Sequence, residues 1–140
     1  MKELEFQLAR NVLCLANRIV AGRNEHIKEL NLTAEQADSL LFFESHVDCT
    51  LTDLKDYLQI THQTARGIAF RMAEKKLIVL NRSKEDGRCK TIRLTTYGEK
   101  LTERLHENGL HTGSRLLAGM EEEDQIRFVS YVGLALKNLE

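Results

Sequence analysis

The stretch Thr50–Ile78 reads TLTDLKDYLQITHQTARGIAFRMAEKKLI, and it decides the fold. Thr50 and Asp53 form an N-cap pair at the start of a short helix expected over Leu51–Leu58, because threonine at this position accepts a hydrogen bond from the backbone three residues on. Thr61 is placed to cap a second helix. The pattern predicts two helices that are separated by a tight turn.

The second of these helices is expected to run from Thr61 to about Lys76. Its apolar residues recur at helical spacing and predict one buried stripe, made of Ala65, Ile68, Ala69 and Met72. Its first turns instead carry hydroxyl, imidazole, amide and guanidinium groups, on Thr61, His62, Gln63, Thr64 and Arg66. Glutamine pairs with adenine, arginine pairs with guanine, and a helix N-terminus attracts phosphate. An ordinary capped surface helix would be equally polar at its start.

A β-hairpin is expected directly after this helix. Ile78–Arg82 and Cys89–Leu94 have the composition and alternation of strands, and Asp86-Gly87 is a turn signal between them. Two helices followed by a hairpin make a winged helix-turn-helix. A helix of this length fits the major groove of B-DNA, and a hairpin beside it reaches the backbone or the minor groove.

Further helices are expected on both sides of this core. Leu4, Leu8, Val12, Leu15 and Ile19 form a stripe in a long first helix over about Lys2–Leu30, suited to the core and to a dimer interface. Thr33 and Gln36 form a capping pair for a helix that ends near residues 45–48, and one or two bridge residues are possible within 47–50. Thr95 or Thr96 caps a helix after the hairpin, which is expected to loosen at Gly109 and Gly113. A last helix follows the acidic run at 121–124.

The predicted fold class is therefore mainly α with a small β-hairpin wing and six helices. Residues 1–32 and 96–140 are expected to form a helical dimerisation region, and residues 33–95 the winged helix-turn-helix, within one compact chain.

Charge is unevenly distributed along the 140 residues. The net charge is −1, but Thr61–Lys100 holds ten Lys/Arg and four Asp/Glu, a net of +6, which leaves −7 for the rest. A basic centre in an acidic chain suits a nucleic-acid partner, although a solvated basic face would look the same. No signal peptide or membrane-length apolar run is found, so a cytoplasmic protein is expected.

Other classes of function are disfavoured by the sequence. No nucleophile elbow, phosphate-binding loop or HExxH motif is found, so an enzyme is not expected. No cofactor and no metal site are expected, because the three cysteines are widely spaced and form no metal-binding pair. A winged helix that binds a protein remains the alternative, but it would not need the +6 charge.

The segment Leu51–Leu101 resembles the MarR family of bacterial transcription regulators. The resemblance rests on the helix-turn-helix quoted above, on EDGR at residues 85–88 and on IRLTTYGEKL at residues 92–101. It implies a homodimer whose first and last two helices interleave, and whose recognition helices enter successive major grooves of a palindromic operator. The implied function is a DNA-binding repressor that a small ligand releases.

The resemblance also assigns roles to residues. Residues 61–66 and Arg71 belong to the recognition helix, Arg88 reaches the minor groove, and Asp86 orients it. With the other basic residues of the hairpin, the predicted DNA-binding set is Thr61, His62, Gln63, Thr64, Arg66, Arg71, Arg82, Lys84, Asp86 and Arg88. Two positions depart from the family pattern. Gly67 lies inside the recognition helix, and Lys76 stands where a glycine often ends it.

The same family suggests three further alternatives. Some members sense oxidants through a cysteine of the first helix, but Cys14 lies in an apolar stretch and is expected to be buried and inert. A zinc sensor would need His106 and His111 to converge, yet their spacing of five is poor for one helical face. A ligand cleft between the dimerisation helices and the winged domain could be lined by Arg10, Arg18, Phe42, Phe43 and Tyr57.

Overall fold

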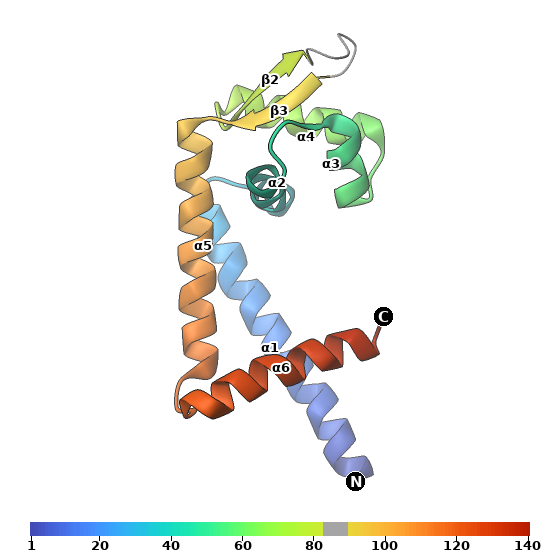
Figure 1. The fold of residues 1–140 in the computed structure, drawn as a ribbon, viewed down its shortest axis with the longest axis vertical. Helices are drawn as coiled ribbons and strands as arrows, with labels where there is room; N and C mark the ends of the chain where they lie inside the picture. The colour runs from blue at the N-terminus through green and yellow to red at the C-terminus, as the bar shows by residue number, and fades with distance from the viewer. Residues whose placement is uncertain (83–89) are drawn as a thin grey trace. The chain divides into compact units, whose positions relative to one another are not determined.

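A computed structural model describes residues 1–82 and 90–140 of the chain. Within these residues it forms six helices and three short strands (Figure 1): α1 (Lys2–Glu29), α2 (Ala34–Ser45), β1 (Cys49–Thr50), α3 (Leu51–Leu58), α4 (His62–Glu74), β2 (Ile78–Arg82), β3 (Lys90–Leu94), α5 (Thr96–Leu117) and α6 (Glu122–Asn138). The predicted fold class and order of elements are confirmed. Cys89, with which the last strand was expected to begin, lies outside the described residues.

The wing is a sheet of three antiparallel strands in the order β1-β3-β2. Ile92 at the centre of β3 pairs with Leu80 on one side and with Cys49 on the other. The bridge expected near residue 50 is therefore a third strand, which fixes the inner edge of the hairpin next to the start of α3.

Threonine caps set the helix boundaries as expected. Thr33 and Thr50 each form a complete capping box, with Gln36 and Asp53 respectively. The Thr61 Oγ1 accepts a hydrogen bond of 3.2 Å from the backbone N–H of Thr64 and so starts α4. These caps place the polar first turn of α4 immediately after the tight turn that ends α3.

The junction of β3 and α5 explains the threonine and glycine of the LTTYG segment. The Thr95 Oγ1 accepts a hydrogen bond of 3.0 Å from the Gly98 N–H and donates one of 2.6 Å to the Lys76 carbonyl. Of the two expected caps, Thr95 is thus the one used. Gly98 packs directly on the carbonyl of Leu77, where a β-carbon would not fit. The junction joins the end of α4 to the start of α5.

Helix α5 is unbroken through Gly109 and Gly113, so the expectation that it loosens there was wrong. A glycine lowers the stability of a helix by about 1 kcal/mol relative to alanine, which is too little to interrupt a long helix that is otherwise well formed.

The chain divides into two compact units, Met1–Asn108 and Gly109–Glu140. The first unit contains the hydrophobic core, which packs α2, α3, α4 and the sheet together and whose most buried large side chains are Phe43, Leu40, Leu54, Met72, Leu77, Ile78 and Ile92. The second unit consists of the end of α5 and of α6, and α6 has no buried residue. None of the described helices is long and apolar enough to cross a bilayer.

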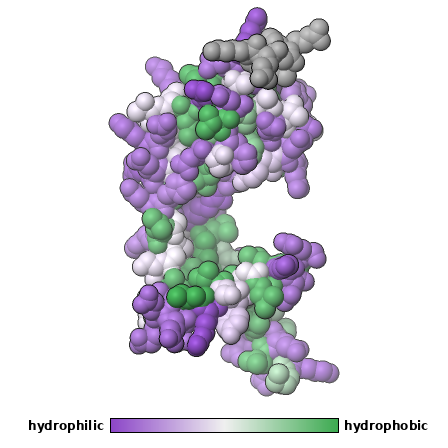
Figure 2. Space-filling model, in the orientation of Figure 1, coloured by the Kyte–Doolittle hydropathy of each residue, from purple (hydrophilic) through white to green (hydrophobic). Residues whose placement is uncertain are grey.

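Helices α1 and α6 expose apolar side chains in the single chain. Only Ile27 is buried in α1, whereas Leu8 and Val12 are 63% and 53% exposed. In α6 the same holds for Ile126, Val129 and several others, and Figure 2 shows hydrophobic residues at the surface in this part of the chain. The expected core role of α1 is thus limited to its C-terminal end.

Cys14 is exposed, which corrects the expectation of a buried thiol. Its apolar neighbours Val12, Leu13 and Leu15 are exposed as well, because nothing in the single chain covers this part of α1.

Candidate nucleic-acid interface

Helix α4 presents its polar residues to solvent and its apolar stripe to the core. The predicted stripe is confirmed, since Ala65, Ile68, Ala69 and Met72 are all buried. The described residues predicted to bind DNA are all exposed: Thr61, His62, Gln63, Thr64, Arg66, Arg71 and Arg82. Their exposure leaves a polar helix face of the size that a major groove accepts.

The far end of α4 is held in place by a lysine. Lys75, the C-cap residue, donates through Nζ to the Asn31 carbonyl at 2.7 Å and to the Gln36 Oε1 at 2.9 Å. Gln36 also belongs to the capping box of α2. Helix α4 is therefore tied to the turn between α1 and α2 as well as to the core.

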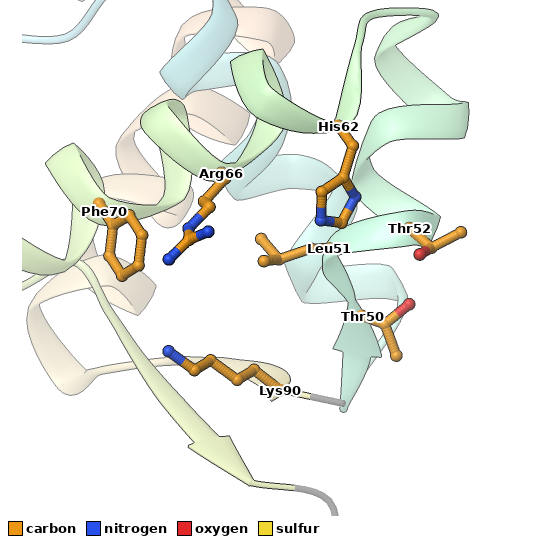
Figure 3. A pocket seen from close by; sticks show the side chains of 7 residues that line it. All are labelled: Thr50, Leu51, Thr52, His62, Arg66, Phe70 and Lys90. Carbon is orange, nitrogen blue, oxygen red and sulfur yellow. The ribbon is translucent and has the colours of Figure 1, made fainter. Parts of the chain in front are cut away.

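Two of the predicted residues, His62 and Arg66, line a surface hollow of about 290 Å³ (Figure 3). The other residues around it are Thr50, Leu51, Thr52, Phe70 and Lys90. They come from β1, from the first turn of α3, from α4 and from the start of β3. The hollow thus gathers cationic and hydroxyl groups of the helix-turn-helix and of the wing at one place.

Two cationic side chains lie near the Phe70 ring in this hollow. The Arg66 Cζ is 5.2 Å from the centre of the Phe70 ring, and the Lys90 Nζ is 5.4 Å from it. Both distances are within the range of a cation–π interaction. In Figure 3 the two charged ends reach into the space in front of the ring.

The two threonines at the start of α4 are already engaged with each other. The Thr61 hydroxyl donates to the Thr64 Oγ1 at 2.8 Å, in addition to accepting the capping bond. Thr61 and Thr64 therefore hold the helix start in place. Gln63 forms no side-chain hydrogen bond with residues 1–82 or 90–140, so its amide is available to a partner.

The Arg71 side chain, one turn later in the helix, lies against Gly67. A β-carbon at residue 67 would lie 3.5 Å from both terminal nitrogens of the Arg71 guanidinium, which is ordinary van der Waals contact. Arg71 thus lies across the surface that Gly67 leaves bare. Lys76 adopts a left-handed conformation with φ of 64°, the geometry for which glycine is favoured after a helix end.

Two basic residues of the wing lie on the described strands: Arg82, which belongs to the predicted DNA-binding set, and Lys90, which does not. Arg82 ends β2 and is paired across the sheet with Lys90. Lys90 was counted in the basic segment but not assigned to the site, although it begins the strand beside the helix. Lys84, Asp86 and Arg88 lie outside the described residues.

Within the described residues, the basic side chains of this face have no carboxylate partner. Among residues 1–82 and 90–140, no salt bridge involves Arg66, Arg71 or Lys90, while other basic residues such as Arg23 and Arg93 pair with aspartates. Over these residues, the face made by α4 and the start of β3 therefore carries positive charge.

The other end of β3 has the opposite character. Arg93 donates from Nε and Nη2 to the two carboxylate oxygens of Asp48, at 2.5 and 2.7 Å. The hydrogen bond and the charge of Arg93 lower the pKa of Asp48, and those of Asp48 raise the pKa of Arg93. A hollow of about 420 Å³ lies beside this pair and is lined by Phe43, Glu44, Val47, Arg93, Leu94, Glu99 and Glu103.

The histidines do not converge. His106 lies 2.7 Å from the Glu44 carboxylate rather than near His111, and the described residues contain no group of ligands fit for a metal ion. The aromatic residues suggested for a ligand cleft mostly pack in the core. Phe42 is buried and stacks on Tyr57 with ring centres 4.4 Å apart. Of the suggested residues, only Phe43 lines the hollow that contains Glu44, Glu99 and Glu103, here called the acidic hollow. Arg10 and Arg18 are exposed on α1.

Comparison with known proteins gives one family. Residues 30–88 match the profile of the MarR family. A MarR family protein from Bacillus stearothermophilus is similar over 99% of this chain and 97% of its own, with 17% identity and a TM-score of 0.85. No curated protein sequence matches the chain.

Two structures of Staphylococcus aureus MepR are also similar. This protein is a transcription regulator of the multidrug efflux pump MepA. A single-residue mutant of MepR, bound to an oligodeoxyribonucleotide, is 24% identical, with 95% of this chain and 98% of that chain covered and a TM-score of 0.72. MepR bound to ethidium bromide is 23% identical, with coverage of 94% and 96% and a TM-score of 0.73. At these identities the likeness concerns the fold.

Proposed function

Because this chain is a winged helix-turn-helix protein of the MarR family, we propose that it binds double-stranded operator DNA as a homodimer and regulates transcription. One observation carries the proposal. Arg66 on the exposed polar face of α4 and Lys90 of β3 line one hollow, and neither has a carboxylate partner among the described residues. The DNA-bound MepR mutant has the same fold and supports this use of it.

Within the proposal, α4 enters the major groove. Gln63 and Arg66 are on its first turns, where side chains of a recognition helix reach base edges. Arg71 and Lys90 are assigned to phosphates, which attract any exposed cation, and His62 is assigned a hydrogen bond to a phosphate. Arg82 and Lys84 extend the phosphate contacts of the wing. Arg88, oriented by Asp86, is assigned to the minor groove, whose negative potential favours a guanidinium.

The dimer is proposed from the exposed apolar residues of α1 and α6. Apolar surface of this extent is unusual for a monomer in water and marks an interface. Residues 1–32 and 96–140 would form the shared region. Two copies related by a twofold axis would then read a palindromic site.

A selection from random duplexes tests the function. The full chain is incubated with a pool of random duplexes, and the bound fraction is sequenced over several rounds. The proposal expects two inverted half-sites whose centres are about 10 base pairs or a multiple apart, as for two recognition helices of one dimer. Recovery of unenriched sequences at every salt concentration would contradict it.

A role as a repressor that a small ligand releases is the finer part of the proposal. The hollow beside Arg93 and Asp48 supports a ligand, because Glu99 and Glu103 line it next to the apolar side chains of Val47 and Leu94. Carboxylates on an apolar surface suit an organic cation with a flat apolar body. Ethidium, which MepR binds, has this chemistry.

Titration calorimetry with ethidium tests the ligand. We expect saturable binding that weakens in Glu99→Gln/Glu103→Gln, and release of the selected duplex as ethidium is added. Because ethidium also binds DNA, the calorimetry is done without duplex. In the release experiment, a duplex bound by an unrelated repressor is the control for the effect of ethidium on the DNA itself. Equal binding by the parent and the double variant would remove the acidic hollow as the site.

A further inference from the structure

Phe70 is an aromatic residue that the core does not explain. It is on α4, outside the buried stripe, and its side chain is 37% exposed. Its ring instead forms one wall of the hollow between α4 and the start of β3 (Figure 3). Burial in the core therefore does not explain why this exposed position of α4 is a phenylalanine.

The contacts of the ring supply that reason. Arg66 is one helical turn before Phe70, while Lys90 comes from a separate element, the first residue of β3. Their charged ends are 5.2 and 5.4 Å from the ring centre. An aromatic face attracts cations through its negative quadrupole, so one ring holds two cations of like charge that would otherwise repel each other.

We propose that Phe70 is a positioning residue for DNA binding: it holds Arg66 of the recognition helix and Lys90 of the wing at a fixed spacing before the duplex arrives. The inference rests on the proposed function and adds to it a link between helix and wing. Long basic side chains lose rotamer freedom when they bind phosphate. A side chain that is already held loses less, which gives higher affinity.

A merely space-filling role predicts a different result. If the ring only covers apolar surface next to Leu51, a leucine of similar hydrophobicity would replace it without loss. If the ring acts through its π face, tyrosine would replace it and leucine would not. The pair Phe70→Leu and Phe70→Tyr therefore separates the two roles.

The affinity of each variant is measured by fluorescence anisotropy with a selected duplex at one salt concentration and then over a salt series. We expect Phe70→Leu to weaken binding roughly three- to tenfold, the range for the rotamer freedom of one long side chain that must then be fixed on binding. Phe70→Tyr should stay within about twofold of the parent. In the Arg66→Ala/Lys90→Ala background, Phe70→Leu should have almost no further effect, since the cations on which it acts are gone.

The contact between Lys90 and the Phe70 ring can also be measured without DNA. In the NMR spectrum of the free parent protein, the ring current of Phe70 should shift the ε-methylene protons of Lys90 upfield, and Phe70→Leu should remove the shift. Absence of the shift in the parent overturns the inference. A parent that binds no duplex overturns the proposed function and this inference together. A parent that binds, with Phe70→Leu binding equally well, overturns the inference alone.

Discussion

Gly98, in the first turn of α5, lies against the backbone carbonyl of Leu77, and a β-carbon on residue 98 would fall far inside the contact distance to that oxygen. The same carbonyl accepts hydrogen bonds from the backbone N–H and the hydroxyl of Thr95, at 3.0 and 3.1 Å. The segment between α4 and β2 and the start of the long helix α5 are thus in direct backbone contact, which only glycine allows.

Gly98→Ala is therefore expected to destabilise the protein. The clash is with backbone rather than with a flexible side chain, so either α5 or the turn at Leu77 must shift, and overpacking of this kind costs about 1–3 kcal/mol. Urea unfolding followed by circular dichroism measures the change. Gly67→Ala is the matched control: its β-carbon meets only the flexible end of Arg71, and it should stabilise the helix by about 1 kcal/mol. Equal effects of the two changes would contradict the assignment.

Lys76→Gly is expected to stabilise the protein by about 1 kcal/mol. Lys76 has a positive φ of 64° directly after α4, a conformation that glycine adopts without steric cost. Lys76→Ala removes the charge but keeps the unfavourable backbone, so it separates the two effects. Chemical denaturation of the three proteins side by side gives the answer, and a glycine variant no more stable than the alanine variant would refute it.

The sequence predicted most of this architecture because its signals are local. Caps such as Thr50 with Asp53, and the apolar stripe of α4, depend on residues three or four apart, which a helix brings together by its own geometry. Lys76 was noted as a departure from a glycine position, and its positive φ shows the physical reason.

Contacts between distant residues could not be predicted in this way. The pair of Asp48 and Arg93 joins residues 45 positions apart, and Lys90 meets Phe70 only because β3 lies beside α4. No spacing rule signals either contact. The exposure of Cys14 was missed for another reason: an apolar stretch of sequence was taken to be buried, but in the single chain nothing covers this part of α1.

Buried Cys49 gives a prediction for alkaline pH. Burial, with a smaller contribution from the charge of Asp53, raises the pKa of the Cys49 thiol to about 11. The folded state therefore disfavours the thiolate, so the stability from this group is full below the unfolded pKa near 9 and is lost as pH rises toward 11. Between these values the parent should lose on the order of 2 kcal/mol more than Cys49→Ala. Parallel curves for both proteins would show that the thiol does not titrate in this way.

The two described thiols should also differ in reactivity. In a Cys89→Ser background at pH 8, iodoacetamide should label Cys14, which is exposed, while Cys49 should react only as the protein unfolds. Mass spectrometry of the labelled peptides over time separates the two rates. Labelling of Cys49 in the native protein as fast as in urea would contradict its burial.

The proposed dimer is tested by charge on α1. Val12→Glu places a carboxylate within the exposed apolar stripe, whereas Gln7→Glu adds the same charge on another side of the helix. Light scattering at micromolar concentration should report a dimer for the parent and for Gln7→Glu, and dissociation for Val12→Glu. A monomeric parent protein would contradict the proposed dimer. A Val12→Glu variant that remains a dimer would show that the apolar stripe of α1 is not part of the interface.

The separate roles proposed for α4 and for the hairpin can be tested on a selected duplex. Gln63→Ala should weaken binding at particular base pairs, while Arg88→Ala, outside the described residues, should weaken binding to all sequences. A panel of single-base substitutions in the operator, measured at one salt concentration, distinguishes the two patterns. Equal binding of both variants and the parent to every duplex would reject these roles.

The central claim is that the cationic face of α4 and β3 holds the DNA, and the salt dependence of affinity measures it most directly. Between 50 and 200 mM salt, the logarithm of the association constant should fall linearly with the logarithm of the salt concentration, with a slope of about −0.9 for each phosphate contact. Arg71→Ala and Lys90→Ala, which remove the two proposed phosphate contacts, should each reduce that slope by about one, while Lys28→Ala, which removes the same charge from α1, should leave it unchanged. A parent protein that retards no duplex even at the lowest salt concentration, or variants that all share one slope, would contradict the claim.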